Sequence, residues 1–372
     1  MINLSNFYNF NWKTINKKIF FCFIFLFILG VFFSFSSTSY LASEKLDKNY
    51  YYYFQRHFLY ALIGLFAMLV ISILKEEIIN KAVFPIFFIL VCLLFSVQFL
   101  GVEVKGSRRW IDLYFFRLQP IELIKPFFVL TVCSMLNFYH SKSKHLAILF
   151  SFFVLSMIVV LLFLQPDIGQ SVLLVLTWGS IIFIFGLSLF YIFTTLITIS
   201  SILALSVIIF SEKFSYLIIR INNFFSIDQI SFQTKRALEA ISLGGLTGQG
   251  MGEGILKDFV PEAHTDYVIA IISEEFGSIV SIMIVLIFLY IFYETIKEIQ
   301  IAKKNKTKLI LTGLISLLIF QLFIHLGVNT NILPSTGMTM PFISYGGSSL
   351  LGSGILSGLI INYTRKRFYD FD

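Results

Sequence analysis

Acidic residues are rare in this chain, yet the stretch 261–277, "PEAHTDYVIAIISEEFG", collects four of them around an apolar run. Its polar members are Glu262, His264, Thr265, Asp266, Glu274 and Glu275. Carboxylates grouped in this way can transfer protons, line an ion path through a membrane or cap the start of a helix. His264 is more often a hydrogen-bonded structural group than a metal ligand. Which of these alternatives applies depends on the helices and loops that position the stretch.

A basic segment at 103–118, "EVKGSRRWIDLYFFRL", places Arg108 and Arg109 next to Trp110. Guanidinium groups match phosphate and carboxylate oxygens in a bidentate manner. The segment therefore predicts a site for anionic groups. The alternative is that the arginines contact the head groups of membrane lipids.

A carboxylate and an ammonium follow in "RLQPIELIKPF", where Glu122 and Lys125 are three residues apart. Pro120 suits the first turn of a helix, and the spacing puts both side chains on one helix face. Charges at the edge of a bilayer are costly unless they are paired or hydrated, so they indicate function. The alternative is an ion pair that anchors the end of the helix.

Two more segments have unusual composition. Asp167 lies in "LQPDIGQS", where proline and glycine are also typical of a simple turn and cap. The segment 329–349, "NTNILPSTGMTMPFISYGGSS", is too rich in Gly, Pro, Ser and Thr for a lipid-exposed helix. Its backbone N–H groups and hydroxyls, at Ser344, Gly346 and Gly347 above all, could hold phosphate oxygens. A plain turn is the alternative.

Several common active-site patterns are absent. The sequence has no Walker-type Gly-x4-Gly-Lys-Ser/Thr, no HExxH, no CxxC and no GxSxG. ATP-driven transport, zinc proteolysis, thiol redox chemistry and serine hydrolysis are thereby excluded in their usual forms. Cys22, Cys92 and Cys133 lie in apolar runs without the spacing of a metal site, so no metal ligand set is predicted.

The composition shows what carries these residues. Hydrophobic residues make up 57% of the 372-residue chain and charged residues only 13%, where a soluble domain has about 25% charged residues. A bilayer needs about 20 apolar residues per helix. The chain is therefore predicted to be an all-α polytopic membrane protein, one domain over 1–372. The ten expected spans are 19–38, 58–74, 83–102, 120–138, 146–164, 169–186, 189–210, 270–293, 309–328 and 344–362.

The basic residues between spans predict the topology. Most of them fall on one side if the N-terminal tail 1–18 and the C-terminal tail 363–372 are both cytoplasmic. A large outer-face loop, 211–269, then lies between the seventh and eighth spans. The net charge of +7 is explained by this distribution, so nucleic-acid binding is not expected. The basic segment 103–118 is an exception on the outer side, which favours binding over a topological role.

Four motifs, taken together, resemble one family. "GSRRWIDL…RLQPIELIK", "QPDIGQS", "LGGLTGQGMGEG…VPEAHTDYVIAIISEEFG" and "LPSTGMTMPFISYGGSSLL" look like the SEDS proteins of shape, elongation, division and sporulation. They occur in that family's order over nearly the whole chain. The linker "GEGILKDFV" and the segment "STGMTMPFISYGGSS" are closer to the division branch than to the elongation branch.

The resemblance implies a ten-helix peptidoglycan glycosyltransferase at the outer face of the bacterial inner membrane, acting at the division septum. Its substrate would be lipid II, an undecaprenyl-pyrophosphate-linked disaccharide-peptide. Its partners would be a class B penicillin-binding protein and other membrane proteins of the divisome. No cofactor is firmly expected, and a divalent metal at the pyrophosphate is left open.

The family's essential aspartate corresponds to Asp266, which would be the general base for the acceptor hydroxyl. The substrate-binding positions would be Arg56, Arg108, Arg109, Trp110, Glu122, Lys125, Ser344, Gly346 and Gly347. The supporting positions would be Asp167, Glu262, His264, Thr265, Glu274 and Glu275. Three alternatives remain: an elongation-type glycosyltransferase, a lipid II flippase or other transporter, and a non-catalytic scaffold. A transporter should have paired acids near the midplane of the membrane, whereas these charges fall at the outer boundary.

Overall fold

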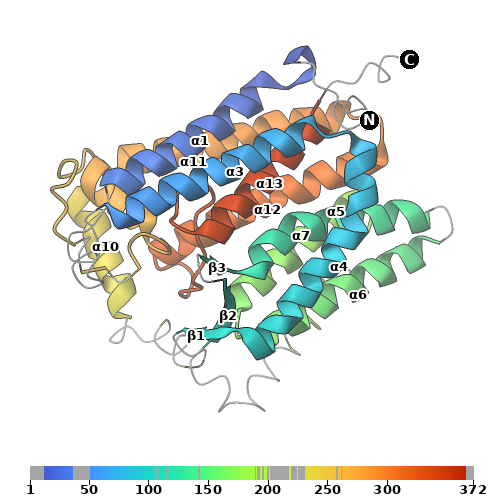
Figure 1. Cartoon of the computed structure of the whole chain (residues 1–372), viewed down its shortest axis with the longest axis horizontal. Helices are drawn as coiled ribbons and strands as arrows, with labels where there is room; N and C mark the ends of the chain where they lie inside the picture. Colours follow the sequence, from blue (N-terminus) through green and yellow to red (C-terminus); the bar gives the residue numbers. More distant parts are fainter. Residues whose placement is uncertain are drawn as a thin grey trace.

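The apolar runs form a bundle of long helices with a small sheet at one end (Figure 1). The computed structural model describes residues 12–36, 51–104, 107–113, 116–140, 143–188, 231–256, 259–260 and 262–365, with isolated positions between 190 and 224. The helices are η2 (Trp12–Thr14), α1 (Lys17–Ser36), α3 (Tyr52–Ile73), α4 (Glu76–Leu100), α5 (Pro120–His140), α6 (Lys144–Leu164), α7 (Ile168–Phe185), α10 (Phe232–Gly244), α11 (Val268–Ile301), α12 (Asn305–Asn329) and α13 (Gly347–Tyr363). The strands are β1 (Val102–Val104), β2 (Ser107–Asp112) and β3 (Arg117–Leu118).

Eight of the described helices are long and apolar enough to cross a membrane: α1, α3, α4, α5, α6, α7, α11 and α12. They correspond to eight of the ten expected spans, and the chain is a multi-pass membrane protein. The last expected span is α13, which has 17 residues and begins at Gly347, not at 344. The expected span 189–210 lies outside the described residues, apart from isolated positions. The number ten and the placement of the 211–269 loop stay predictions.

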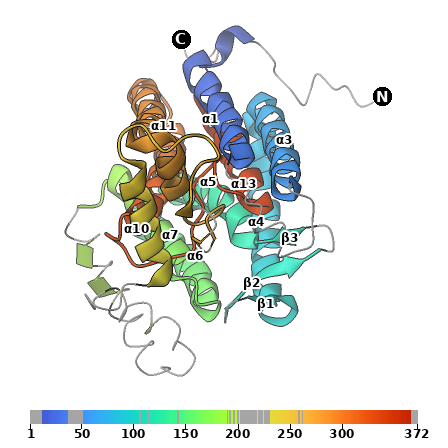
Figure 2. The same ribbon diagram turned by 90° about the vertical axis from the view of Figure 1, so that its left-hand side faces the viewer.

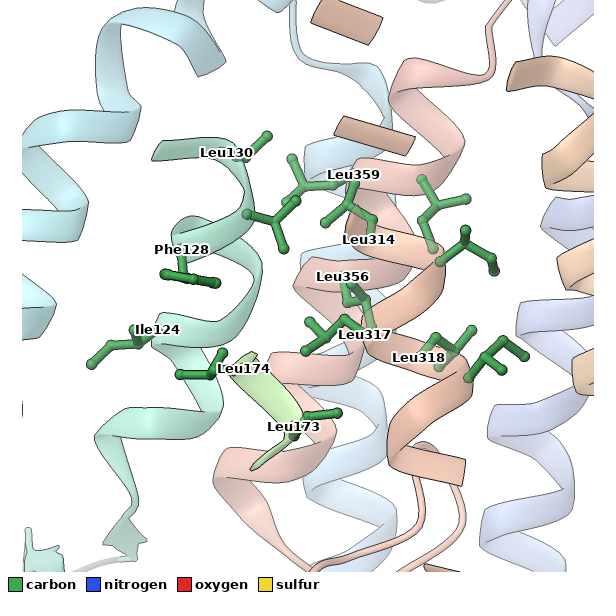
Figure 3. Close-up of a cluster of buried hydrophobic side chains, with 14 of the residues drawn as sticks. Ile124, Phe128, Leu130, Leu173, Leu174, Leu314, Leu317, Leu318, Leu356 and Leu359 are labelled. Carbon is green, nitrogen blue, oxygen red and sulfur yellow. The ribbon is translucent and has the colours of Figure 1, made fainter. Parts of the chain in front are cut away.

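The core lies where α5, α7, α12 and α13 meet. Figure 3 labels members of one buried hydrophobic cluster there: Ile124 and Phe128 of α5, Leu173 and Leu174 of α7, and leucines of α12 and α13. Helix α12 is buried over most of its length, as expected of a helix surrounded by others. Phenylalanines remain exposed on the outer helices α1, α3, α4 and α6. In a membrane these side chains face lipid.

Helix α13 runs beside α3 and also contacts α5 (Figures 1 and 2). Glycines line the contact: a methyl group at Gly354 would collide with the carbonyl oxygen of Gly64, and one at Gly352 would lie 2.5 Å from Glu122 O. Small residues let membrane helices approach closely, because there is little hydrophobic driving force between them in lipid. The helix that carries Glu122 is thereby held against α13.

The basic segment 103–118 forms part of the sheet, with strand order β1-β2-β3 and both pairs antiparallel. Side chains alternate between the two faces of a strand. In β2 this alternation buries Ser107, Arg109 and Ile111 and leaves Arg108 and Asp112 exposed. Adjacent arginines therefore have opposite surroundings.

Helix α11 is broken at Gly277, whose φ of +84° is not helical. The freed carbonyls of Glu274 and Glu275 accept hydrogen bonds from Gln249 N (2.8 Å) and Gly250 N (3.0 Å). A side chain at Gly248 or Gly277 would collide with the facing backbone. The Gly-rich stretch 244–254 thus covers the break in α11 by close backbone contact. Its glycines have a structural function that does not require an anionic ligand.

Candidate active site

The short segment of His264, Thr265 and Asp266 is held by three hydrogen bonds from other parts of the chain. These are Tyr345 N to His264 O (2.8 Å), Ser344 Oγ to Thr265 O (2.6 Å) and Asn329 Nδ2 to Asp266 O (3.0 Å). The turn is closed by Glu262 O, which accepts from the amides of both Thr265 and Asp266 at 3.1 Å. Three successive carbonyls with separate donors fix the segment against the end of α12 and the 330–346 segment.

Asp266 does not occupy the capping position of α11. The helix begins at Val268 and its N-cap residue is Tyr267, whose side chain makes no capping hydrogen bond. The Tyr267 hydroxyl instead lies 3.3 Å from Thr234 Oγ1 on α10. The interpretation of Asp266 as the N-cap of this helix is therefore wrong. Its half-buried carboxylate is held in place for another reason.

Arg109 and Asp266 face the same small space. Gly337 lies between them with φ +73°, and a methyl group there would be 3.5 Å from Arg109 Nη1 and 3.6 Å from Asp266 Oδ2. Arg109 Nε lies 3.6 Å from Asp167 Oδ2, and its guanidinium donates to the carbonyls of Gln165 and Pro166. The structure thus brings Arg109, Asp167 and Asp266 close together.

Asp167 has two functions in this arrangement. It is the N-cap of α7 and accepts from Gln170 N at 3.5 Å, as its turn-like sequence allowed. Burial raises the pKa of Asp167, and the nearby Arg109 guanidinium opposes this shift. The Asp167 side chain therefore contacts both the start of α7 and the inward-facing Arg109.

Glu122 and Lys125 form a buried ion pair with Nζ and Oε2 2.7 Å apart. Gln170 Nε2 donates to Glu122 Oε1 at 2.8 Å, and Lys125 Nζ donates to Gln321 Oε1 at 3.0 Å. The side chains of the pair are only 5% and 4% exposed. A pair that merely anchored the end of the helix would reach solvent or head groups, so this pair belongs to the interior of the bundle.

Both inward-facing cations therefore have a carboxylate partner before any substrate binds. Lys125 is paired with Glu122, and Arg109 with Asp167. A buried ion pair weakens the net field that either cation presents to a distant anion. A phosphate that approaches must compete with the carboxylate, or the pair must separate. Arg109 is better placed than Lys125 to contact a phosphate beside Asp266, because its Nη1 faces the Gly337 space that Asp266 shares.

Aromatic rings connect α3 to the segment of Asp266. Tyr53 lies 5.3 Å from the His264 ring and 5.4 Å from the Tyr345 ring, measured between centroids. Arg56 stacks over Tyr52 at 4.8 Å. Burial raises the pKa of Tyr345, with neighbouring Tyr60 contributing and Arg56 opposing. Arg56 thus lies at the edge of this cluster, close enough to Tyr345 to affect its pKa.

Other expected site residues are placed differently. Arg108 points away from Arg109 and lies 3.4 Å from Glu103 Oε2 in an exposed pair, while Trp110 is half-buried on the same outward face. Their substrate contacts stay predictions. Glu274 accepts from Leu256 N at 2.7 Å, and Glu275 accepts from Ser36 of α1. These two glutamates support the break in α11 and lie away from the Gly337 space.

The 330–346 segment mainly makes internal bonds. Ser344 Oγ accepts from Met340 N at 2.8 Å in addition to donating to Thr265 O. Gly346 is the N-cap of α13, and a methyl group on Gly347 would lie 3.3 Å from the Tyr60 ring. Phosphate binding by these residues stays a prediction. Among the described residues, no group of three or more His, Cys, Asp or Glu side chains could hold a metal ion.

Comparison with known proteins decides the family. The profile of the cell cycle protein family of FtsW, RodA and SpoVE matches residues 16–369. The chain belongs to this family. It is 31% identical to the probable peptidoglycan glycosyltransferase FtsW of Caulobacter vibrioides, over 91% of this chain and 86% of the relative. The FtsW of Haemophilus influenzae is 29% identical over 93% and 89%.

Solved structures of the FtsW/RodA/SpoVE family share the fold. A peptidoglycan synthase complex, described as coordinating polymerization and crosslinking, contains a chain that matches with a TM-score of 0.76 and 21% identity, over 95% of this chain and 98% of that one. The rod shape determining protein RodA of Thermus thermophilus matches with a TM-score of 0.70 and 21% identity, over the same shares.

This FtsW/RodA/SpoVE member also carries three buried polar residues that sequence reasoning missed. Gln321, His325 and Asn329 are spaced four apart on α12 and are all buried. Gln321 Nε2 donates to Thr339 O at 2.9 Å, and His325 Nδ1 lies 2.9 Å from Met338 O. Their i, i+4, i+8 spacing in an apolar span was the available signal, because such a row is costly in a membrane unless it is bonded.

Proposed function

We propose that the chain is a peptidoglycan glycosyltransferase of the division type, which polymerises lipid II into glycan strands. The proposal rests on the family and on relatives from several bacteria, which are each named probable peptidoglycan glycosyltransferase FtsW. The single structural observation that carries it is the fixed Asp266, which is not used as a helix cap and faces the space lined by Arg109.

Asp266 is the general base in this proposal. The acceptor sugar's 4-hydroxyl attacks the anomeric carbon of the donor sugar, the C–O bond to the pyrophosphate breaks, and the hydroxyl proton passes to the carboxylate of Asp266. One displacement converts the α-linked phosphate into a β-linked product, so no covalent enzyme intermediate is required. The polar, hydrogen-bonded surroundings at the end of α12 support this function, since a base must be held within hydrogen-bond reach of its proton.

Arg109 stabilises the charge that develops on the leaving pyrophosphate. Its guanidinium is oriented by Asp167 and two carbonyls, so it loses little freedom on meeting a phosphate. Lys125 contributes when the substrate competes with Glu122, and Arg56 approaches from α3. A divalent metal, if bound with the substrate, would help to neutralise the charge on the leaving pyrophosphate, and the described residues offer no cluster of three or more His, Cys, Asp or Glu side chains to hold one.

The proposal includes a location and partners. The reaction takes place at the outer face of the inner membrane, at the division septum, with both termini in the cytoplasm. A class B penicillin-binding protein crosslinks the product, and other divisome membrane proteins assemble around the pair. The likeness to a chain of a solved peptidoglycan synthase complex supports such an assembly.

The test is polymerisation of labelled lipid II by the purified chain, with and without a class B penicillin-binding protein. The parent chain should make long glycan that lysozyme degrades, while Asp266→Asn should make almost none. A parent preparation that folds and binds its partner but makes no glycan contradicts the proposal. Glycan made equally well by Asp266→Asn contradicts the assignment of the base.

A further inference from the structure

The polar row on α12 joins the two charged parts of the site. Gln321 contacts Lys125 through its carbonyl oxygen and Thr339 through its amide. Asn329, eight residues further, holds Asp266 O. At 1.5 Å per residue the row spans about 12 Å, or roughly two turns. One face of a single helix therefore contacts both Lys125 and the residue that carries the proposed base.

The direction of the hydrogen bonds of Asn329 and His325 is fixed, because their partners are main-chain carbonyls, which can only accept. Asn329 Nδ2 lies 3.0 Å from Asp266 O and 2.9 Å from His325 O, so both amide hydrogens are used. His325 Nδ1 donates to Met338 O, so in the neutral ring Nε2 carries the lone pair. The free atoms of both side chains are therefore acceptors.

Within the described part of the chain, these acceptors have no partner. They are His325 Nε2 and Asn329 Oδ1, and the neighbouring unpartnered atoms are Gln170 Oε1 and Thr336 Oγ1. His325 is 1% and Asn329 0% exposed. Buried polar atoms in proteins nearly always have a partner, and leaving one without a bond is costly. Other buried atoms of the described residues, such as both ring nitrogens of His57, also lack a partner. What distinguishes this row is that its two acceptors lie on the side chains that hold Asp266 O and Met338 O.

We propose that this row is a further functional part of the site. Asn329 is a positioning residue that sets the place of Asp266, and His325 offers Nε2 to a hydroxyl or amide N–H of the saccharide substrate. The proposal rests on the proposed function of Asp266. The side chains of His325 and Asn329 donate hydrogen bonds to the protein's own carbonyls. His325 Nε2 is the atom that accepts from the substrate.

Asn362 provides a matched control for Asn329. It is equally buried, and its Nδ2 also donates to main-chain carbonyls, those of Ile71, Ser72 and Leu74. It lies at the opposite end of the bundle, near the end of α13. Its replacement by alanine therefore has the same chemical consequence, the loss of a carboxamide that holds the backbone, without contact to Asp266.

The first experiment compares Asn329→Ala with Asn362→Ala in the lipid II polymerisation assay with the partner present. Displacing a reacting group by about 1 Å can cost a factor on the order of 10². Asn329→Ala should thus lower kcat by about that factor with little change in KM. Asn362→Ala should lower the melting temperature and leave kcat unchanged. If Asn329→Ala does not fold, Asn329→Ser, which keeps one donor, should show an intermediate kcat.

The second experiment separates the two nitrogens of His325. His325→Asn puts an amide N–H near the place of Nδ1 and removes the acceptor at Nε2, whereas His325→Gln does the reverse. Loss of a substrate hydrogen bond should raise the KM of His325→Asn about tenfold. His325→Gln should keep a KM near the parent value and melt at a lower temperature. A structural role alone predicts the opposite order.

The outcomes separate this inference from the proposed function. If the parent makes no glycan, both fail. If the parent polymerises lipid II, Asp266→Asn does not, and Asn329→Ala and His325→Asn keep parent kcat and KM, the row alone is wrong. A kcat loss in Asn329→Ala or Asn329→Ser that Asn362→Ala does not share, with the KM increase in His325→Asn, supports it.

Discussion

The two ends of the bundle use ion pairs in different ways. At the end where α1 begins and α13 ends, the termini end, Glu294 lies 3.3 Å from Lys18 and 3.2 Å from Lys297; the lysine side chains are 61% and 42% exposed and that of Glu294 is 7% exposed. At the end that holds Asp266, the Glu122–Lys125 and Arg109–Asp167 pairs have side chains at most 7% exposed.

This difference indicates where the molecule concentrates its functional groups. Exposed pairs are screened by water and contribute little to stability. Buried pairs cost desolvation energy that their attraction only partly offsets, so they are weak as stabilising devices. A chain that keeps two of them next to a fixed aspartate retains them for another use. The termini end can lose a charge with little consequence, whereas the two buried pairs at the Asp266 end cannot.

The largest effect is expected at Asp266. A carboxamide cannot take the proton of a sugar hydroxyl, and removal of a general base lowers rates by a factor on the order of 10² to 10⁴. Asp266→Asn should therefore insert, fold and bind its partner but make almost no glycan in the lipid II assay. Exposed Glu262→Gln is the control and should keep most of the activity.

Breaking the buried pair should cost stability as well as activity. Lys125→Ala leaves Glu122 charged and buried, which costs about 3–5 kcal/mol. The double change Lys125→Met with Glu122→Gln removes both charges and should recover most of that loss, measured by thermal unfolding in detergent, without recovering polymerisation. A Lys125→Ala variant as stable as the parent would show that water reaches this pair.

A smaller effect is expected from a methyl group between Arg109 and Asp266. Gly337→Ala forces alanine into a φ of +73°, at a cost of about 1–2 kcal/mol, and adds a carbon within 3.6 Å of both groups. Activity should fall more than stability does. Gly346→Ala, in extended backbone with its nearest neighbour 3.4 Å away, should be tolerated. Equal tolerance at both positions would mean that the Gly337 space is not used.

The smallest effect is expected at the termini end. Glu294→Gln removes a carboxylate whose two lysine partners are largely hydrated, so the free energy of unfolding should change by less than about 1 kcal/mol. The change should also shrink as salt is added. Polymerisation should be normal. A loss of stability as large as that of Lys125→Ala would remove the distinction between the two ends.

Much of this arrangement could be predicted from the sequence. The lengths of the apolar runs predicted eight of the described spans. The order of spans and motifs placed Arg109, Asp167 and Asp266 at one end of the bundle. Such features are local: a run of about 20 apolar residues spans a bilayer whatever surrounds it. The break inside α11 was less predictable. It lies at Gly277 and depends on a backbone contact with 244–250.

The pairing of side chains could not be predicted in the same way. Arg108 and Arg109 are neighbours in sequence, and only the register of β2 with β1 decides that Arg109 points inward. Glu274 and Glu275 were expected as supporting residues, but their partners at the α11 break, Leu256 N and Ser36, could not be read from the sequence. The polar row on α12 was visible as spacing, but its hydrogen bonds depend on the carbonyls of Asp266, Met338 and Thr339, which lie outside the helix.

The three bonded carbonyls at His264, Thr265 and Asp266 limit the torsional freedom of the backbone. Each peptide group in this turn has its own donor, so no φ or ψ angle there can change without breaking a bond to α12 or to the 344–345 region. A displacement of either element is therefore transmitted to the carboxylate. Mutations that alter catalysis without touching substrate are expected to cluster behind this turn, at Asn329 and Ser344 and their neighbours.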